Sequence, residues 1–323
     1  MKNINISLLC FLILGTGAVL SCKEESENIF TMFKDVKVTF HGDNPLSVTD
    51  YKLVNDGDSV YIDYTITSAK EDIYTVVEEK VGGSSRSSPE RSSSAVSDES
   101  ERRSYSRVIK LKMNRDGKTS YRIYALNQKG YYIGDGYTKV TIEVSPSYKV
   151  IADRRIYAPD SVDNSASPSF YSISRGESFS HEQGEANSES IDFGIWCQYD
   201  SRPAHANQLI YNFYSPSADP NPFTIYDISS WDKRTTLFSA PITNQTNTFR
   251  YTLVSGSVIE EQAKAKKIDV SSTDFSTWQA GLAPGNLVYF LTPEGKYGAI
   301  HVNQSTEGTD GRPYINISVK VQK

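Results

Sequence analysis

The chain contains few cysteines and histidines. Its 323 residues include three cysteines, Cys10, Cys22 and Cys197, and four scattered histidines. We expect Cys10 to be removed with an N-terminal signal and Cys22 to be acylated, so Cys197 stands alone and an intramolecular disulfide framework is excluded. The histidines lack the spacing of a metal site. We therefore expect domains held together by core packing, with no cofactor and no bound metal.

Catalytic motifs and excess positive charge are also lacking. The sequence has no Gly-x-Ser-x-Gly elbow, no phosphate-binding loop and no zinc-protease motif. A net charge of −5 without a basic block argues against nucleic acid as a partner. Asp192 is the one carboxylate inside a strand-like run with aromatic neighbours, and we interpret it as a hydrogen-bonding residue. We expect no enzyme, with a carbohydrate-active hydrolase as the catalytic alternative.

The first 21 residues have the plan of a secretory signal peptide. Lys2 is the only charge before the apolar run 6–14, and small residues follow at 15–18. The apolar run is too short to span a bilayer as a helix, which takes about 20 residues. We therefore expect residues 1–21 to be removed.

The residues Val19-Leu20-Ser21-Cys22 resemble a bacterial lipobox. The resemblance implies that Cys22 carries acyl chains such as palmitate and becomes the mature N-terminus, which anchors the protein to a membrane. Lys23-Glu24-Glu25 resembles an export signal that directs lipoproteins to the outer face of the outer membrane. Residues 22–33 are then the lipidated cysteine and a tether. The alternative is an ordinary signal peptide with an incidental cysteine.

Residues 34–145 have the pattern of an immunoglobulin-like β-sandwich. The segment 36–40 alternates apolar and polar residues, and Val60, Ile62, Tyr64 and Ile66 share one face of another strand. Short strands of this kind, separated by turn residues, are typical of a sandwich of about 110 residues. The paired cysteines of antibody domains are absent. We expect this domain to be a spacer.

Three segments of this first domain are predicted to lie outside the strands. The Ser-rich, mixed-charge stretch 84–106 holds too little apolar surface to offset the cost of ordering, so we predict a mobile loop. The sequences Asn55-Asp56-Gly57-Asp58 and Gly134-Asp135-Gly136 do not match the spacing of a calcium-binding loop, and we interpret both as turns.

Residues 148–323 are predicted to form a larger β-rich domain, sandwich or jelly-roll-like, with one or two short helices. Ser257 and Glu260 have the spacing of a capping box, which predicts a helix over 258–266 with a Glu260–Lys264 ion pair. A turn of helix is also predicted over 229–232. Near the C-terminus, 286–291 and 296–303 read as a hairpin. In the last strand Ile315, Ile317, Val319 and Val321 are predicted to face inward, and Asn316, Ser318, Lys320 and Gln322 outward.

Aromatic residues are the candidate ligand-binding groups of this second domain. Exposed Trp and Tyr rings can stack on the C–H faces of sugars, while amides and carboxylates bind the hydroxyls. The run 208–226 is rich in Tyr, Asn and Pro, as a binding loop would be. The candidates are Trp196, Trp231 and Trp278, supported by Tyr211, Tyr214 and Tyr226. The alternative for each ring is a place in the core, where aromatic residues bury 150–250 Å².

Several short segments resemble landmarks of an uncharacterised family of outer-surface lipoproteins from glycan-foraging gut bacteria. These segments are Ile191-Asp192-Phe193-Gly194, Asp227-Ile228-Ser229-Ser230-Trp231, Gly295-Lys296-Tyr297-Gly298 and Ile317-Ser318-Val319-Lys320-Val321-Gln322. The resemblance implies a cell-surface protein and carries no established activity. Neighbouring lipoprotein families of similar architecture bind starch or other glycans, so we expect this protein to bind a polysaccharide or oligosaccharide without catalysis, beside an outer-membrane transporter complex. The alternative function is a structural or adhesive lipoprotein whose partner is another protein.

Overall fold

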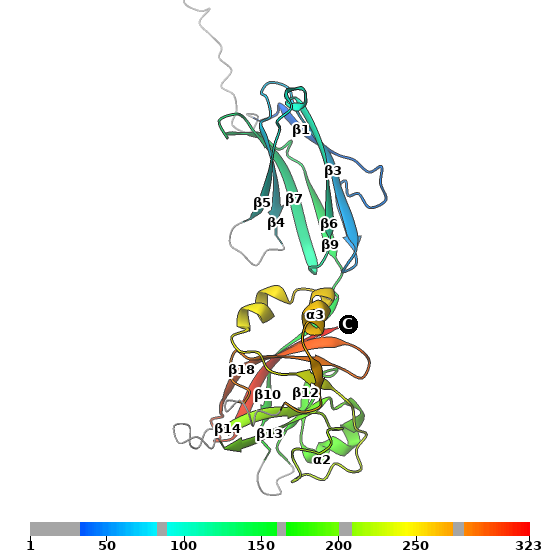
Figure 1. Cartoon of the computed structure of the whole chain (residues 1–323), viewed down its shortest axis with the longest axis vertical. Coiled ribbons are helices and arrows are strands. Elements are labelled where there is room, and N and C mark those ends of the chain that lie inside the picture. Colours follow the sequence, from blue (N-terminus) through cyan, green and yellow to red (C-terminus); the bar gives the residue numbers. More distant parts are fainter. Residues whose placement is uncertain (1–32, 83–88, 160–165, 200–208, 274–280) are drawn as a thin grey trace, which may run out of the picture.

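The computed structural model describes residues 33–82, 89–159, 166–199, 209–273 and 281–323. It contains two β-sandwiches arranged end to end, with the last strand of the first leading directly into the second (Figure 1). The predicted mainly β class with few short helices is confirmed. The predicted signal peptide, Cys22 and most of the tether lie outside the described residues. No helix among the described residues is long and apolar enough to cross a membrane.

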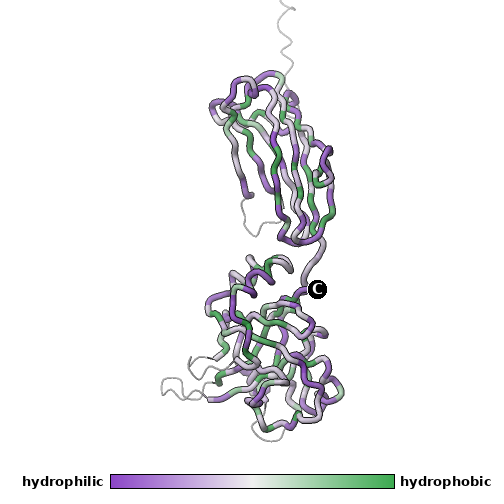
Figure 2. The backbone as a smooth tube through the Cα atoms, turned by 45° about the vertical axis from the view of Figure 1, so that its right-hand side comes forward, coloured by the Kyte–Doolittle hydropathy of each residue, from purple (hydrophilic) through white to green (hydrophobic). Residues whose placement is uncertain are grey.

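The first sandwich pairs a three-stranded sheet with a six-stranded sheet. The smaller sheet consists of β1 (Val36–Phe40), β3 (Ser59–Ser68) and β6 (Ser104–Lys112). The larger runs β2 (Tyr51–Val54), β9 (Lys139–Val144), β7 (Gly117–Leu126), β4 (Thr75–Val81) and β5 (Glu90–Ala95), and β8 (Tyr132–Gly134) pairs with β7. The β2–β9 pair is parallel and the other pairs are antiparallel. Every second residue of β3 faces the core, as the alternating pattern predicts. Figure 2 shows hydrophobic and hydrophilic residues interspersed along these strands.

The prediction of a mobile loop over 84–106 is wrong for its described part. Residues 90–95 form the edge strand β5, residues 99–101 a short 3-10 helix, and β6 begins at Ser104. Because an edge strand needs backbone pairing with one neighbour and little apolar burial, its serines and charges are compatible with it. Ser92 donates to buried Glu78 of β4 at 2.7 Å, and Arg91 to Glu79 at 2.7 Å. Polar side-chain bonds therefore replace the apolar burial that the sequence lacks.

The second sandwich packs a six-stranded sheet against a four-stranded one. The first runs β10 (Tyr148–Tyr157), β19 (Pro313–Gln322), β18 (Tyr297–Glu307), β17 (Leu287–Leu291), β15 (Leu237–Ser239) and β16 (Ile268–Val270). The second runs β12 (Glu177–Phe179), β11 (Phe170–Ser172), β13 (Phe193–Tyr199) and β14 (Leu209–Tyr214). Phe193, Phe213, Phe238 and Phe290 fill the core between them. The predicted β17–β18 hairpin is confirmed.

The outer face of the six-stranded sheet is covered by helices. These are α3 (Gly256–Lys264) and a π-helix (Thr248–Thr252). Ile315, Ile317, Val319 and Val321 face the core as predicted. The prediction that Ser318 and Lys320 face solvent is wrong, because they are buried to 7% and 6% exposure. The Lys320 ammonium instead donates to the carbonyls of Phe249 and Leu253 at the end of the π-helix, at 2.6 and 2.7 Å.

The outer face of the four-stranded sheet is covered by irregular chain. Residues 215–236 cross it, next to α2 (His181–Gly184) and a 3-10 helix, η3 (Glu185–Ser190). Residues 229–230 form a turn, so the helical turn predicted over 229–232 is wrong. Phe170, Tyr226 and Trp231 pack together beneath this cover.

The N-terminus of α3 is capped differently from the prediction. Ser255 is the N-cap and accepts from the Val258 amide at 3.3 Å, so the helix begins two residues earlier than the Ser257 capping box implies. Ser257 is free to bind elsewhere because Ser255 fills the capping position. The predicted Glu260–Lys264 ion pair is present one turn further along.

Hydrogen bonds join the two sandwiches around this helix end. The Ser257 amide and hydroxyl donate to the Asp56 carboxylate at 2.5 and 2.7 Å, across 201 residues of sequence. Ser147, between β9 and β10, donates to the Asp116 carboxylate through both its amide and its hydroxyl, each at 2.6 Å. The Gly256 amide donates to the Ser147 hydroxyl at 2.7 Å. We call these contacts the joint; they restrain the second sandwich relative to the first.

Candidate functional site

A cleft of about 610 Å³ opens at one edge of the second sandwich, where elements of both sheets meet. Its walls come from the start of β10, the turn after β11, η3, the β17–β18 turn and the end of β19. Ile173 and Val321 supply an apolar floor. The polar residues used below are Lys149, Ser174, Ser190, Asp192, Arg234, Glu294 and Lys296. We call this the edge cleft.

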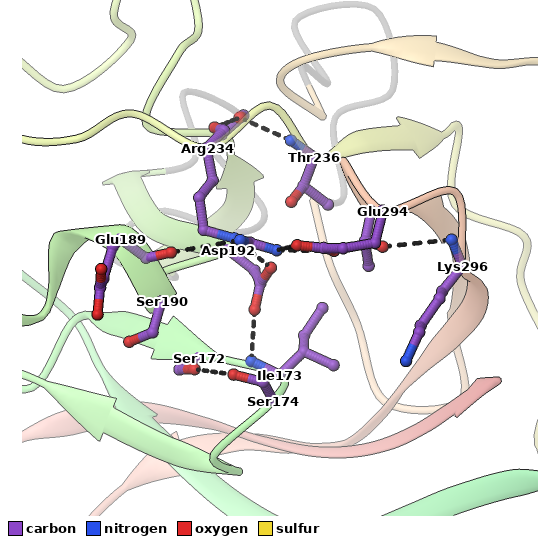
Figure 3. Close-up of polar contacts among 12 residues, drawn as sticks. Ser172, Ile173, Ser174, Glu189, Ser190, Asp192, Arg234, Thr236, Glu294 and Lys296 are labelled. Carbon is purple, nitrogen blue, oxygen red and sulfur yellow. Dashed lines mark hydrogen bonds and ion pairs between the residues drawn. The ribbon is translucent and has the colours of Figure 1, made fainter. Parts of the chain in front are cut away.

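Arg234 connects the two sides of the edge cleft (Figure 3). Its Nε donates to Asp192 Oδ1 at 3.0 Å, and its Nη2 donates to both carboxylate oxygens of Glu294 at 2.6 and 2.9 Å. Its Nη1 also donates to the backbone carbonyl of Glu189 at 3.3 Å. A guanidinium suits this place because its planar fork binds several acceptors at once. The hairpin turn bearing Glu294 is thereby fixed to the chain before β13.

The two carboxylates bound by Arg234 lie in different environments. Asp192 is buried to 1% exposure, and its Oδ2 accepts from the Ile173 amide at 2.7 Å. Burial raises the pKa of Asp192, and the Arg234 charge opposes this rise. Glu294 is more exposed. Its partial desolvation also raises its pKa, but hydrogen bonds from Arg234 and Thr292 outweigh this and hold the pKa below the usual value. The carboxylates of Asp192 and Glu294 both form ion pairs with Arg234, and these ion pairs hold the wall of the cleft in place.

The rim of the edge cleft carries lysines and hydroxyl groups. The Lys149 ammonium donates to the Ser174 carbonyl at 3.0 Å, which holds this charge at the mouth. Lys296 is exposed in the β17–β18 turn and makes no ion pair with any described residue. Ser190 lines the third side. The cleft thus presents cations and hydroxyls around a small apolar floor.

Two further clefts adjoin the edge cleft. One, of about 650 Å³, lies at the joint and shares Glu294, Lys296, Gln322 and Lys323 with the edge cleft. The other, of about 480 Å³, lies beyond the β11–β12 turn and is lined by Arg154, Arg155, Glu177, Gln183 and Asn187, among others. We call this second one the flank cleft. Strand β10 contributes to both the edge cleft and the flank cleft.

The candidate aromatic residues do not form an exposed platform. Tyr211 is 2% exposed in the core between the sheets. Tyr214, of β14, is 1% exposed beneath the 215–236 segment. Tyr226 and Trp231, of that segment, are 4% and 6% exposed because they point inward and pack in the same cluster. Trp196 is half-buried beside this cluster, and its Nε1 is buried without a hydrogen-bond partner. Trp278 lies outside the described residues.

These rings are buried because both faces of the four-stranded sheet are covered. Tyr211 and Tyr214 point to opposite sides of β14. If the outer face of the sheet were uncovered, Tyr214 would be exposed to solvent. The run 208–226, predicted as a binding loop, instead contributes β14 and part of the covering segment. The core alternative for the aromatic residues therefore describes Tyr211, Tyr214, Tyr226 and Trp231.

Few of the residues that build the edge cleft could be predicted from the sequence. Asp192 was singled out as a hydrogen-bonding carboxylate, and its bonds to Ile173 and Arg234 confirm that interpretation. Glu294 lies in the predicted turn 293–295, a position where a charged residue is unremarkable. Arg234 follows Asp192 by 42 residues, and no local pattern links them. Only the packing of the covering segment brings them together.

Metal-binding and nucleophilic sites have little support in the part of the chain that the structure describes. No group of three or more His, Cys, Asp or Glu residues there could hold a metal ion. Cys197 packs against the core of the second sandwich. In the turn 55–58, the Asp58 carboxylate accepts from the Asn55 amide and Asp56 is directed to Ser257.

Comparisons with known proteins return only weak structural likenesses. No family model and no curated protein matches the chain. One similar structure is a polysaccharide deacetylase from Bacillus cereus, with a TM-score of 0.22 and 11% identity over 40% of this chain and 36% of that one.

A second is the CARDB domain of a Pyrococcus furiosus protein in complex with di-metal ions, with a TM-score of 0.22 and 6% identity over 35% of this chain and 96% of that domain. A third is the alkylpurine DNA glycosylase AlkC from Pseudomonas fluorescens bound to DNA, with a TM-score of 0.21 and 13% identity over 34% of this chain and 30% of that one. The chain spans only about a third of the deacetylase and of the glycosylase. Likenesses of this size assign no function.

Proposed function

We propose that this protein is a lipid-anchored cell-surface protein whose second sandwich binds a glycan in the edge cleft without catalysis. The observation that carries the proposal is the cleft itself. Its volume of about 610 Å³ lies within the range of small-molecule sites, and its walls are held in place by the Arg234 bonds. A preorganised wall favours binding because little ordering cost remains when the ligand enters.

The chemistry of the rim suits a ligand rich in hydroxyl groups. Lys149 and Lys296 can donate hydrogen bonds, and carbonyls such as that of Ser174 can accept them. The Ser190 hydroxyl donates to the Asn187 carbonyl at 2.8 Å and can therefore accept from a ligand, while the Ser174 hydroxyl shares a bond of 3.1 Å with Ser172. The apolar floor of Ile173 and Val321 offers a surface for the C–H face of a sugar ring. The aromatic stacking expected from the sequence is replaced here by aliphatic contact.

Catalysis is not part of the proposal because two of the three Asp and Glu side chains that line the cleft, Asp192 and Glu294, are already engaged, which leaves Glu189 without a second carboxylate to act with. A glycosidase needs one carboxylic acid that can donate a proton and one carboxylate that can attack or activate water. Asp192 is buried and bound by Arg234 and the Ile173 amide, and Glu294 accepts two bonds from Arg234. Neither oxygen pair is directed at a free reaction centre.

The proposal is tested by binding, using a variant that fills the cleft. Residues 30–323 should be retarded in native gels containing at least one of a broad set of host and dietary polysaccharides, without releasing reducing ends. Ser174→Trp should abolish the retardation because the exposed Ser174 lines the cleft and an indole there occupies it. Ser93→Trp, at an exposed serine of β5 in the first sandwich, is the matched control and should bind normally.

Two outcomes would remove this proposal. One is the absence of retardation by every polysaccharide. The other is equal binding by Ser174→Trp and the unchanged protein, with both showing the same thermal unfolding midpoint.

A protein partner is the second candidate function, and one feature of the first sandwich favours it. Tyr51 and Leu53 are 52% and 58% exposed on β2, which pairs only with β9 and therefore forms a sheet edge. Leu46 is also exposed nearby in sequence. An open edge with apolar side chains can accept a strand from another protein.

A further inference from the structure

We infer that the ligand of the edge cleft is an anionic glycan, carrying carboxylate or sulfate groups, and that its chain continues into the flank cleft. The inference rests on the proposed function, since it specifies which class of glycan the same site binds. Its basis is the distribution of charged groups over the two clefts and the strand that connects them.

Cations of the two clefts lie along one strand and the facing hairpin. Strand β10 places Lys149 in the edge cleft and Arg154 and Arg155 in the flank cleft, and Lys296, just before β18, also lines the edge cleft. All four are exposed. In the described residues no ion pair joins any of the four to a carboxylate. Their charges are therefore available to a ligand.

The named carboxylates of the same surface are outnumbered by its named cations, four to five. Asp192 and Glu294 are both bound by Arg234, so this trio contributes one net negative charge. Glu189 and Glu177 are exposed and lack an ion pair among the described residues. In the flank cleft the two positive charges of Arg154 and Arg155 exceed the one negative charge of Glu177, so the flank cleft keeps a net positive charge. The surface is thus more positive than the chain as a whole, whose net charge is −5.

The two clefts are suitably placed for one linear chain. They flank the β11–β12 turn, with Ser174 lining the edge cleft and Gly176 lining the flank cleft. Lys149 is bonded to the carbonyl of Ser174 at this turn, so a cation stands where a polymer would cross. Asn187 and Gln183 in the flank cleft add amides that can bind sugar hydroxyls. Arg155 is stacked on the Tyr314 ring, 4.7 Å from its centroid, which fixes its position.

The test compares matched anionic and neutral polymers with the full chain. Full methyl esterification of polygalacturonate turns each carboxylate into a neutral ester and leaves the sugar backbone unchanged, and polyglutamate supplies carboxylates without sugar. We expect polygalacturonate to bind best, with an affinity that falls as salt is added, because exposed ion pairs are screened. Lys149→Gln with Lys296→Gln should weaken this binding about fivefold to tenfold, in keeping with the modest contribution of each exposed ion pair. Lys112→Gln with Lys129→Gln, two exposed lysines of the first sandwich, should leave it unchanged.

A separate variant tests whether the glycan chain continues into the flank cleft. Arg154→Gln should weaken the binding of long polygalacturonate and leave the binding of digalacturonate unchanged, since a disaccharide occupies the edge cleft alone. Equal effects on both lengths, or no effect on either, would overturn the continuation into the flank cleft.

The outcomes separate this inference from the proposed function. Binding of neutral glycans with no loss in the double lysine variant would overturn the anionic class and leave glycan binding intact. Equal binding of polyglutamate would overturn recognition of a glycan as such. Failure of every neutral and anionic glycan to bind would overturn both.

Discussion

Arg234 joins two elements of the second sandwich that are far apart in sequence. It bonds to Asp192, just before β13, and to Glu294 in the β17–β18 turn. The side chain of Asp192 is 2% exposed and that of Glu294 is 49% exposed. A cation is required mainly by the buried carboxylate, because an unpaired charge in the interior is costly.

This asymmetry predicts a pH-dependent effect of Arg234→Met. Near pH 7 the variant should lose about 3 kcal/mol of unfolding free energy, since the ionised Asp192 is left buried without its cation. Because burial raises the pKa of Asp192, the folded state holds the proton more readily than the unfolded state, and this group's contribution favours folding more as pH falls. The loss should therefore shrink as pH is lowered toward about 4.5. Urea unfolding at several pH values measures it.

Glu294→Gln is the control for the exposed partner. It should cost less than about 1 kcal/mol because exposed ion pairs are weak and screened by solvent. A loss in Arg234→Met that is the same at every pH would contradict a role for the Asp192 charge.

At the scale of the element, α3 belongs to both sandwiches. Its apolar face, with Ile259 and Ala263, packs on the outer face of the six-stranded sheet. Its first turn binds Asp56 of the first sandwich through Ser257. A carboxylate at a helix N-terminus also interacts favourably with the helix dipole. The helix therefore links the cleft-bearing sandwich to the first one.

Asp56→Ala should loosen this link without unfolding either sandwich. We expect a loss of about 1 kcal/mol, the usual contribution of a group bonded at a helix N-terminus. We also expect faster hydrogen exchange at the amides of the first turn of α3, and a wider range of shapes in X-ray scattering. Asp58→Ala is the matched control, because its carboxylate bonds to the Asn55 amide within its own turn. Equal acceleration in both variants would show that the turn, rather than the bond to Ser257, supports the helix.

At the scale of the whole molecule, the first sandwich separates the N-terminal segment from the clefts. Its β1 begins at Val36, and its last strand β9 leads through residues 145–147 into β10 (Figure 1). If Cys22 carries acyl chains, the edge cleft and flank cleft are held beyond the first sandwich. This arrangement suits the capture of a polymer outside the cell.

The lipid anchor is tested by Cys22→Ala. We expect the variant to leave the membrane fraction, because the acyl chains proposed for this cysteine would supply most of the hydrophobic attachment. Fractionation and immunoblotting measure the shift. Cys10→Ala is the control, since Cys10 lies in the segment predicted to be removed, and it should remain with the membrane. Retention of Cys22→Ala in the membrane fraction would contradict the lipobox interpretation.

Local patterns in the sequence account for the elements that depend on neighbours along the chain. Alternation in 59–68 predicts β3, the turn 293–295 predicts the β17–β18 hairpin, and Glu260 with Lys264 marks α3. These features follow from periodicity and short-range pairing, which any strand, hairpin or helix must satisfy. The mainly β class was therefore available from the sequence by itself.

Tertiary structure alone decided which faces are covered and which charges meet. Lys320 follows the outward period of β19 yet is buried by the π-helix, and Tyr214 is buried by the segment after β14. Arg234 finds Asp192 across 42 residues and Glu294 across 60. Periodicity states which side of a strand a residue occupies, but burial depends on what packs against that side. The edge cleft could not be predicted from the sequence, because it depends on which segments pack against each sheet.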